Sequence, residues 1–249
     1  MTDIPGWTLL AEKIGGAGHG IFQTSEVQIT DKGYADEQFL TLTLLARTIS
    51  NLKGALLLLR AKRIVEARTI TRCCFENQYW VVALAEQGEA FARKMVHDGA
   101  GHRRARGQLI FQSAVQIEAS VKDQLRGWMK QAKQNFADAK TLSPKEVASV
   151  RPDFEKTYIF YAQLSSDAAH PSIDALHRYL VPHKGDEVGG VDIEPVVKDV
   201  EIELTLYYLC SAVMGVCVGV NQILGGTPGG MVLNQLADVV SSLSSETKA

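Results

Sequence analysis

The sequence predicts an all-α fold: a single-domain bundle of about six to eight helices with one buried apolar helix near the C-terminus. Apolar residues recur every three or four positions through much of the chain, as they do on one face of a helix. Only seven of 249 residues are proline, and most of these stand at expected helix ends. A chain of this length that is 46% hydrophobic can bury a large core without disulfides or a structural metal.

The first part of the chain divides into an arm and two helices. Residues 1–33 are rich in glycine and lack helical periodicity, so we expect an irregular N-terminal arm there. The all-helical domain then spans residues 34–242. Its first helix is expected from about 35 to 60 and its second from about 62 to 86. The apolar seam of the first helix consists of Leu42, Leu45, Ile49, Leu52, Leu56 and Leu59.

The middle of the chain alternates between helical and broken segments. Residues 97–107 contain three glycines and are expected to form a loop or the start of a helix. Residues 108–140 contain no proline and have a helical composition, and a break near 118–120 is an alternative to one continuous helix. In the run Ser143 to Glu146, serine stands at the cap, proline at the first helical position and glutamate at the third. This order predicts a helix N-terminus.

The last third of the chain is expected to hold four more helices. One runs from about 153 to 169, and a short one from about 171 to 180, because proline at 171 interrupts the chain. Residues 181–194 form the longest expected loop. Pro195 is expected to open a long helix that ends near residue 223. A short helix over 231–242 follows, and a serine-rich disordered tail covers 243–249.

Residues 204–220 carry no charge and approach the length of a membrane span. However, Asn221 and Gln222 interrupt the run, and no lysine or arginine follows until Lys248, so the positive flank of a membrane helix is missing. The preceding residues are amphipathic. We therefore expect the central helix of a bundle here and no contact with a membrane.

A polar ridge lies on the second expected helix. Arg68, Arg72 and Glu76 are spaced by four residues, so they share one side of the helix. One interpretation is a surface ladder of ion pairs. The other is a polar stripe that faces the bundle interior, which the apolar neighbours favour, and which requires the charges to pair or to bind something. We expect Arg72 and Glu76 to be in contact and partly buried.

A second polar group ends at His170. Tyr158, Tyr161, Ser165 and Ser166 precede this histidine at helical spacings. We expect the imidazole to project from a helix junction toward Arg72, as a structural residue or as a polar ligand or acid/base group. A metal site is the weaker alternative and would use Asp167, His170, Asp174 and His177. We predict no metal, since the spacing matches no known motif.

A resemblance to a known family enters at these residues. An Arg/Glu helix, followed about 90 residues later by a Tyr-x₆-Ser-Ser-x₃-His-Pro segment, resembles a bacterial all-helical family known only as a domain of unknown function. The resemblance covers about residues 40–225 and rests on Arg72, Glu76, Tyr158, Ser165, Ser166 and His170. It implies an all-helical fold and no particular reaction.

More distantly, the chain is similar to the HEPN superfamily of helical ribonucleases and toxins. That superfamily's signature is an arginine followed after four to six residues by a histidine, and Arg178 and His183 have this spacing. Pro182, directly before the histidine, departs from a helical presentation. The similarity implies metal-independent cleavage of RNA, with His170 or His183 as the acid/base group.

Basic residues predict an anion-binding face for phosphate or RNA, with a solvated surface as the alternative. The residues concerned are Arg103, Arg104, Lys122, Arg126 and Lys130. The net charge of −2 argues against bulk nucleic-acid binding. No phosphate-binding or dinucleotide-binding glycine motif is present, so we expect no cofactor.

These features predict a cytoplasmic binding or regulatory module with a semi-buried Arg-Glu/Ser-His site. The catalytic candidates are His170, Glu76 and Arg72, and the ligand-binding candidates are Arg68, Tyr158, Tyr161, Ser165 and Ser166. The expected partner is a small ligand or another protein, which includes a second copy of the chain. The alternative is a HEPN-like ribonuclease or toxin that acts on RNA. The four cysteines are expected to be buried, reduced thiols.

Overall fold

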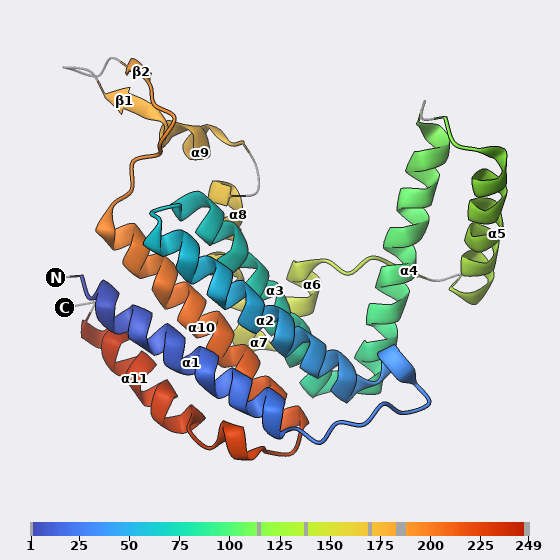
Figure 1. Cartoon of the computed structure of the whole chain (residues 1–249), viewed down its shortest axis with the longest axis horizontal. Helices are drawn as coiled ribbons and strands as arrows, with labels where there is room; N and C mark the ends of the chain where they lie inside the picture. The colour runs from blue at the N-terminus through green and yellow to red at the C-terminus, as the bar shows by residue number, and fades with distance from the viewer. Residues whose placement is uncertain (1, 114–115, 137–138, 169–170, 183–187, 247–249) are drawn as a thin grey trace.

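The computed structural model describes residues 2–113, 116–136, 139–168, 171–182 and 188–246, and the part of the chain that it describes is all-α (Figure 1). Eight of the helices in this part have seven residues or more. These are α1 (Ile4–Thr24), α2 (Glu37–Arg60), α3 (Ile64–Gln87), α4 (Glu89–Gln112), α5 (Ala119–Asn135), α8 (Tyr158–Ala168), α10 (Asp199–Ile223) and α11 (Leu233–Glu246). The short elements are α6 (Pro144–Ala148), α7 (Pro152–Glu155), α9 (Ile173–His177), the strands β1 (Leu180–Pro182) and β2 (Val188–Val191), and two 3₁₀ turns, η1 (Gly33–Ala35) and η2 (Pro228–Gly230).

Residues 4–24 are helical, so the prediction of an irregular arm over residues 1–33 was wrong for this part and holds only for residues 25–32. Asp3 is the N-cap of helix α1, and its carboxylate accepts a hydrogen bond from the Gly6 amide at 2.9 Å. Its buried face packs against α10 and α2. A Cβ atom on Gly18 would lie 3.1 Å from Sγ of Cys217, so this glycine allows the two helices to approach closely. Gly15 and Gly18, which suggested an irregular arm in the sequence, are packing residues here.

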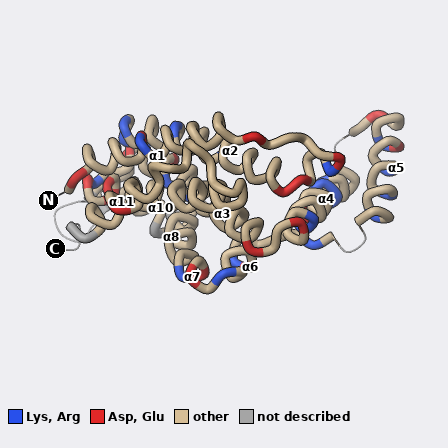
Figure 2. The backbone as a smooth tube through the Cα atoms, turned by 90° about the horizontal axis from the view of Figure 1, so that it is seen from below, with Lys and Arg blue, Asp and Glu red and all other residues tan. Residues whose placement is uncertain are grey.

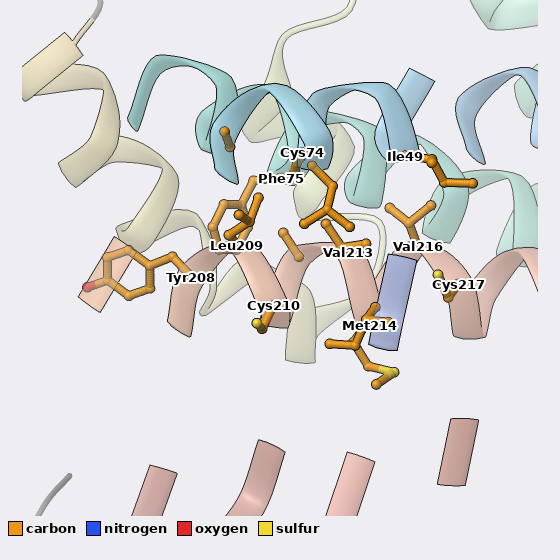
Figure 3. Close-up of a cluster of buried hydrophobic side chains, with 14 of the residues drawn as sticks. Ile49, Cys74, Phe75, Tyr208, Leu209, Cys210, Val213, Met214, Val216 and Cys217 are labelled. Atoms are coloured by element: carbon orange, nitrogen blue, oxygen red, sulfur yellow. The ribbon is translucent and has the colours of Figure 1, made fainter. Parts of the chain in front are cut away.

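Helix α10 lies at the centre of the bundle, as predicted, and contacts α1, α2, α3 and α11. Two helices, α2 and α10, are long and apolar enough to cross a membrane by length and composition alone. In the folded chain, 44% of the most apolar 18-residue stretch of α2 is buried, and 72% of the corresponding stretch of α10. Figure 3 shows α10 side chains such as Leu209 and Val213 directed at α2 and α3. The apolar circumference of α10 is therefore covered by protein on most sides.

All four cysteines are free thiols, and three of them are buried as predicted, whereas Cys73 is half-buried. Burial raises the pKa of Cys210 and of Cys217 to about 12, and it raises the pKa of Cys74 further. These three thiols are therefore protonated packing groups and unsuited to act as nucleophiles.

Helices α4 and α5 form an arm that projects from the bundle (Figure 1). Residues 97–107 belong to the continuous helix α4, so the prediction of a loop there was wrong. Gly107 is buried in the α4–α5 contact, where a Cβ atom would lie 2.9 Å from Sδ of Met129. The helical segment expected over 108–140 is divided between α4 and α5, and α5 begins at Ala119, within the alternative break near 118–120.

Several helix ends differ from the prediction, while the N-terminus at Ser143 is confirmed. Ser143 and Glu146 form a complete capping box at the start of α6. Helix α10 begins at Asp199 and not at Pro195, because the Val196 amide donates to the Arg178 carbonyl at 3.0 Å. The expected loop 181–194 contains the antiparallel pair β1–β2.

The end of the chain also differs from the prediction. Helix α11 continues to Glu246, so residues 243–246 of the expected disordered tail are helical. The remaining tail residues, 247–249, lie outside the described residues.

We predict that Leu209→Ala lowers the free energy of unfolding by about 2–5 kcal/mol, because this fully buried side chain of α10 leaves a cavity when truncated. Urea denaturation of the purified protein measures the effect. Leu57→Ala is the matched control, since Leu57 of α2 is 64% exposed and its truncation is expected to cost less than about 0.5 kcal/mol. Equal losses in the two variants would contradict a central position of α10.

Candidate functional site

The polar ridge predicted on α3 faces α8, and the predicted contact between its two oppositely charged members is confirmed. Nη2 of Arg72 lies 3.1 Å from Oε1 of Glu76, and the two side chains are 24% and 25% exposed. The spacing of four residues brings the groups together on one helix side. Partial burial distinguishes this pair from an ordinary surface ion pair, because less water screens the charges.

Helix α8 supplies two partners that fix the guanidinium. Nε of Arg72 donates to Oγ of Ser165 at 2.8 Å, and Nη2 donates to the Tyr161 hydroxyl. The Tyr161 hydroxyl in turn donates to Oε1 of Glu76 at 2.8 Å. The guanidinium carbon also lies 4.6 Å from the centre of the Tyr161 ring, which adds a cation–π contact. We call Arg72, Glu76, Tyr161 and Ser165 the Arg72 network.

The Tyr161 hydroxyl keeps its proton in this network. Burial, together with the hydrogen bond to Glu76, raises its pKa to about 12. The ring is buried between Tyr158, which stacks on it with centroids 5.3 Å apart, and Tyr79, which meets it edge to face at 6.2 Å. Tyr161 therefore acts as a hydrogen-bond bridge between Arg72 and Glu76 at neutral pH, and it is unsuited to act as a general base there.

Three polar groups of this site lack a protein partner among the residues that the structure describes. They are Nη1 of Arg72, Oε2 of Glu76 and the Tyr158 hydroxyl. All three side chains are half-buried, so their free polar atoms remain within reach of a ligand. The site thus offers two N–H donors, one carboxylate acceptor and one hydroxyl that can do either.

Arg68, predicted to bind a ligand, lies in a neighbouring cluster against α10. Its Nε donates to Oγ1 of Thr205 at 3.2 Å, and its Nη2 lies 3.7 Å from Oε1 of Glu201. Nη1 of Arg178 approaches the same Glu201 oxygen at 2.7 Å. Sequence analysis missed Glu201 and Thr205, because no local pattern links α10 to a residue more than 130 positions earlier. Their roles join α3, α10 and the segment after α9.

Ser166 and His170 do not complete the site within the described residues. The Ser166 hydroxyl is exposed and donates to the Gln163 carbonyl at 2.9 Å, so it is not part of the Arg72 network. His170 and His183 lie outside the described residues, as do the side chains of Asp167 and Asp174. The predicted approach of His170 to Arg72 therefore stays a prediction. No group of three metal-ligating side chains occurs in the part of the chain that the structure describes.

The predicted anion-binding residues lie on the arm and not beside the Arg72 network. Helices α4 and α5 carry nine Lys and Arg against three Asp and Glu, in a chain of net charge −2 (Figure 2). Lys122, Arg126 and Lys130 follow one another at steps of four on α5.

The two arginines predicted on α4 diverge, because adjacent helical residues differ in direction by about 100°. Arg103 lines a hollow with Trp128, whereas Arg104 reaches the Ala139 carbonyl at 3.5 Å. The cations therefore surround the arm and do not form a single cluster.

Comparisons with known proteins identify a family but no activity. A family model described as "Family of unknown function (DUF5677)" matches residues 38–188. The match contains α3 and α8, and hence the whole Arg72 network, together with the arm. No curated protein and no solved structure matches the chain. The predicted resemblance to a family of unknown function is confirmed, and the similarity to the HEPN superfamily stays a prediction.

We predict that Arg72→Ala lowers the free energy of unfolding by about 1–3 kcal/mol. The substitution leaves Glu76, Tyr161 and Ser165 without their charged hydrogen-bond partner in half-buried surroundings. Chemical denaturation at neutral pH measures the loss.

Arg93→Ala is the control for this prediction. Arg93 makes the same kind of pair with Glu89, at 2.9 Å and four residues apart, but the two side chains are well exposed. We expect a change within about 0.5 kcal/mol. If Arg72→Ala were as mild as the control, the network would not contribute to stability.

We also predict that Tyr161 makes the protein less stable at high pH. A tyrosine in the unfolded chain loses its proton near pH 10, whereas Tyr161 in the fold does so at about 12. Between these two pH values the unfolded chain binds fewer protons than the folded chain, so the free energy of unfolding falls as the pH rises. Below pH 10 the tyrosine is protonated in both states and does not make stability depend on pH. Tyr161→Phe is expected to reduce this fall in denaturation experiments across the window. Tyr34→Phe, at an exposed ring, is expected to leave it unchanged.

Proposed function

The chain belongs to the DUF5677 family, and we propose that it is an intracellular binding module that recognises a small polar ligand at the Arg72 network. A regulatory role would follow if the ligand altered the packing of α8 on α3. The proposal rests on one observation, namely that Arg72 is held at Nε and Nη2 while Nη1 has no protein partner in the described part of the chain.

A guanidinium that is fixed before binding favours recognition. Ser165, Tyr161 and Glu76 restrict Arg72 to one orientation, so a ligand does not have to order this long side chain. The half-buried position also strengthens a hydrogen bond to the ligand, because less water competes for it. These two effects are what a binding site gains from a supporting shell of hydrogen bonds.

The chemistry of the open groups indicates the class of ligand. Nη1 of Arg72 requires an acceptor, and Oε2 of Glu76 requires a donor. The Arg72–Glu76 pair is neutral as a whole, so it favours a ligand that carries both kinds of group over a simple anion. Amides and zwitterionic amino acids meet this requirement, and the Tyr158 ring offers an apolar surface beside them.

An intracellular location is in keeping with the cysteines. All four are free, and Cys73 and Cys74, although adjacent, form no disulfide. Free thiols are typical of reducing compartments, and we propose the cytoplasm.

A HEPN-like ribonuclease is the second candidate, and the charge of the arm favours it. Helices α4 and α5 carry a net charge of +6, so the arm would attract the phosphates of RNA although the whole chain has a net charge of −2. The acid/base group of this candidate would be His170 or His183. Metal-independent cleavage requires that purified protein degrade RNA in the presence of EDTA and that its expression arrest growth.

We predict that members of a panel of amino acids and small amides bind the protein through Arg72. Saturation-transfer NMR identifies the binders, and calorimetry measures their affinity. Arg72→Lys is expected to weaken binding about tenfold or more, since lysine keeps the charge but loses the planar, fixed donors. Glu76→Gln is expected to weaken binding of ligands with an ammonium group most.

Arg126→Gln is the control, because this arginine lies on the arm and pairs with Asp123. Binding that is unchanged in both arginine variants would contradict the proposed site. RNA degradation in EDTA, without binding of any panel member, would favour the ribonuclease.

A further inference from the structure

A hollow of about 540 Å³ lies between α4 and the segment that carries α6, and it shares no residue with the Arg72 network (Figure 1 shows the two elements). Its volume falls within the range of sites that hold small molecules. The hollow has an apolar floor and a charged rim, and these two parts come from different elements of the chain.

The floor consists of side chains that belong to the core or pack against it. Phe91 of α4 and Val147 of α6 are almost fully buried, and Leu142 and Val150 are half-buried beside them. The Phe91 ring meets Trp80 edge to face, with centroids 6.4 Å apart. This floor can cover the apolar part of a ligand, because removing methylene groups from water favours binding.

The wall opposite α4 is fixed by local hydrogen bonds. The Leu142 amide donates to Oδ1 of Asp98 at 2.7 Å, which ties the segment to α4. The capping box of Ser143 and Glu146 holds the first turn of α6. The hollow therefore exists before a ligand arrives, which lowers the cost of binding.

The rim is rich in cations. Arg93 and Lys94 stand on α4, beside the His97 ring, and Lys140 approaches from the other side. Glu146 is the one carboxylate among the described residues that line the hollow, and its Oε2 accepts hydrogen bonds from the amide and the hydroxyl of Ser143 at 3.1 and 2.8 Å. Arg93 forms an ion pair with Glu89, whereas Nζ of Lys94 donates a hydrogen bond to the neutral Gln87 side chain at 2.8 Å. The rim keeps an excess of positive charge.

We propose that this hollow binds an organic anion with an apolar body, of the class of medium-chain carboxylates. The carboxylate would meet the cations of the rim, and the chain would lie on the floor of Phe91, Val147 and Val150. A free phosphate would leave the floor unused, and an uncharged alcohol would leave the cations unused. The hollow and the Arg72 network are independent sites with different ligand chemistry.

Decanoate, below its micellar concentration, is the probe, with calorimetry as the measurement. We expect the full chain to bind decanoate at least tenfold more tightly than decanol, and not to bind inorganic phosphate at the same concentrations. Equal affinity for decanoate and decanol, or no binding of decanoate, would overturn the proposal.

Two substitutions locate the ligand. Ala90→Trp places a large ring in the hollow from an exposed position of α4 and is expected to abolish decanoate binding. Ala105→Trp, at an exposed position farther along the same helix, is the matched control and is expected to bind as the natural sequence does. Binding that survives Ala90→Trp would overturn the location.

A charge substitution in the segment before α6 tests the rim without altering a helix. Lys140→Gln is expected to weaken decanoate binding severalfold and to leave decanol binding unchanged. Lys130→Gln on α5 is the control for the loss of one charge. Arg72→Lys is expected to leave decanoate binding intact, so failure of one proposed site does not depend on the other.

Discussion

The fold depends on the burial of one apolar helix. Helix α10 has few polar positions in its second half, so it requires protein contact on every side to avoid exposing apolar surface to water. Helices α1, α2, α3 and α11 pack around it and cover most of its circumference (Figure 1). Close approach is possible because small residues such as Gly18 and Gly219 stand at the contacts.

The Arg72 network lies on the side of this core where α8 covers α3. Burying Arg72 would be unfavourable without partners, and Tyr161, Ser165 and Glu76 supply them. Arg68 is satisfied separately by α10 through Thr205. The polar ridge on α3 therefore contributes to two interfaces. At the interface with α8, Arg72 and Glu76 retain polar atoms that form no hydrogen bond within the described part of the chain and that the packing of the helices does not need.

The arm differs from the bundle in burial and charge. Helices α4 and α5 bury little of their surface and carry most of their charge as lysine and arginine. Where α4 meets the core, Phe91 is fully buried, and the hollow beside it joins apolar floor to charged rim. Both candidate ligand sites thus lie where a polar surface meets the core, which is where burial and hydrogen bonding act together.

The sequence by itself determined the helical class, helices α2, α3 and α10, the cap at Ser143 and the contact between Arg72 and Glu76. These features depend on periodicity and on spacings of three or four residues, which local geometry fixes. Only the tertiary structure decided that the glycine-rich residues 4–24 and 97–107 are helical, because their glycines are tolerated through close packing with distant helices. It also decided that Tyr161 bridges the ion pair and that Glu201 joins Arg68 to Arg178, since contacts between separate segments of the chain leave no periodic trace in the sequence.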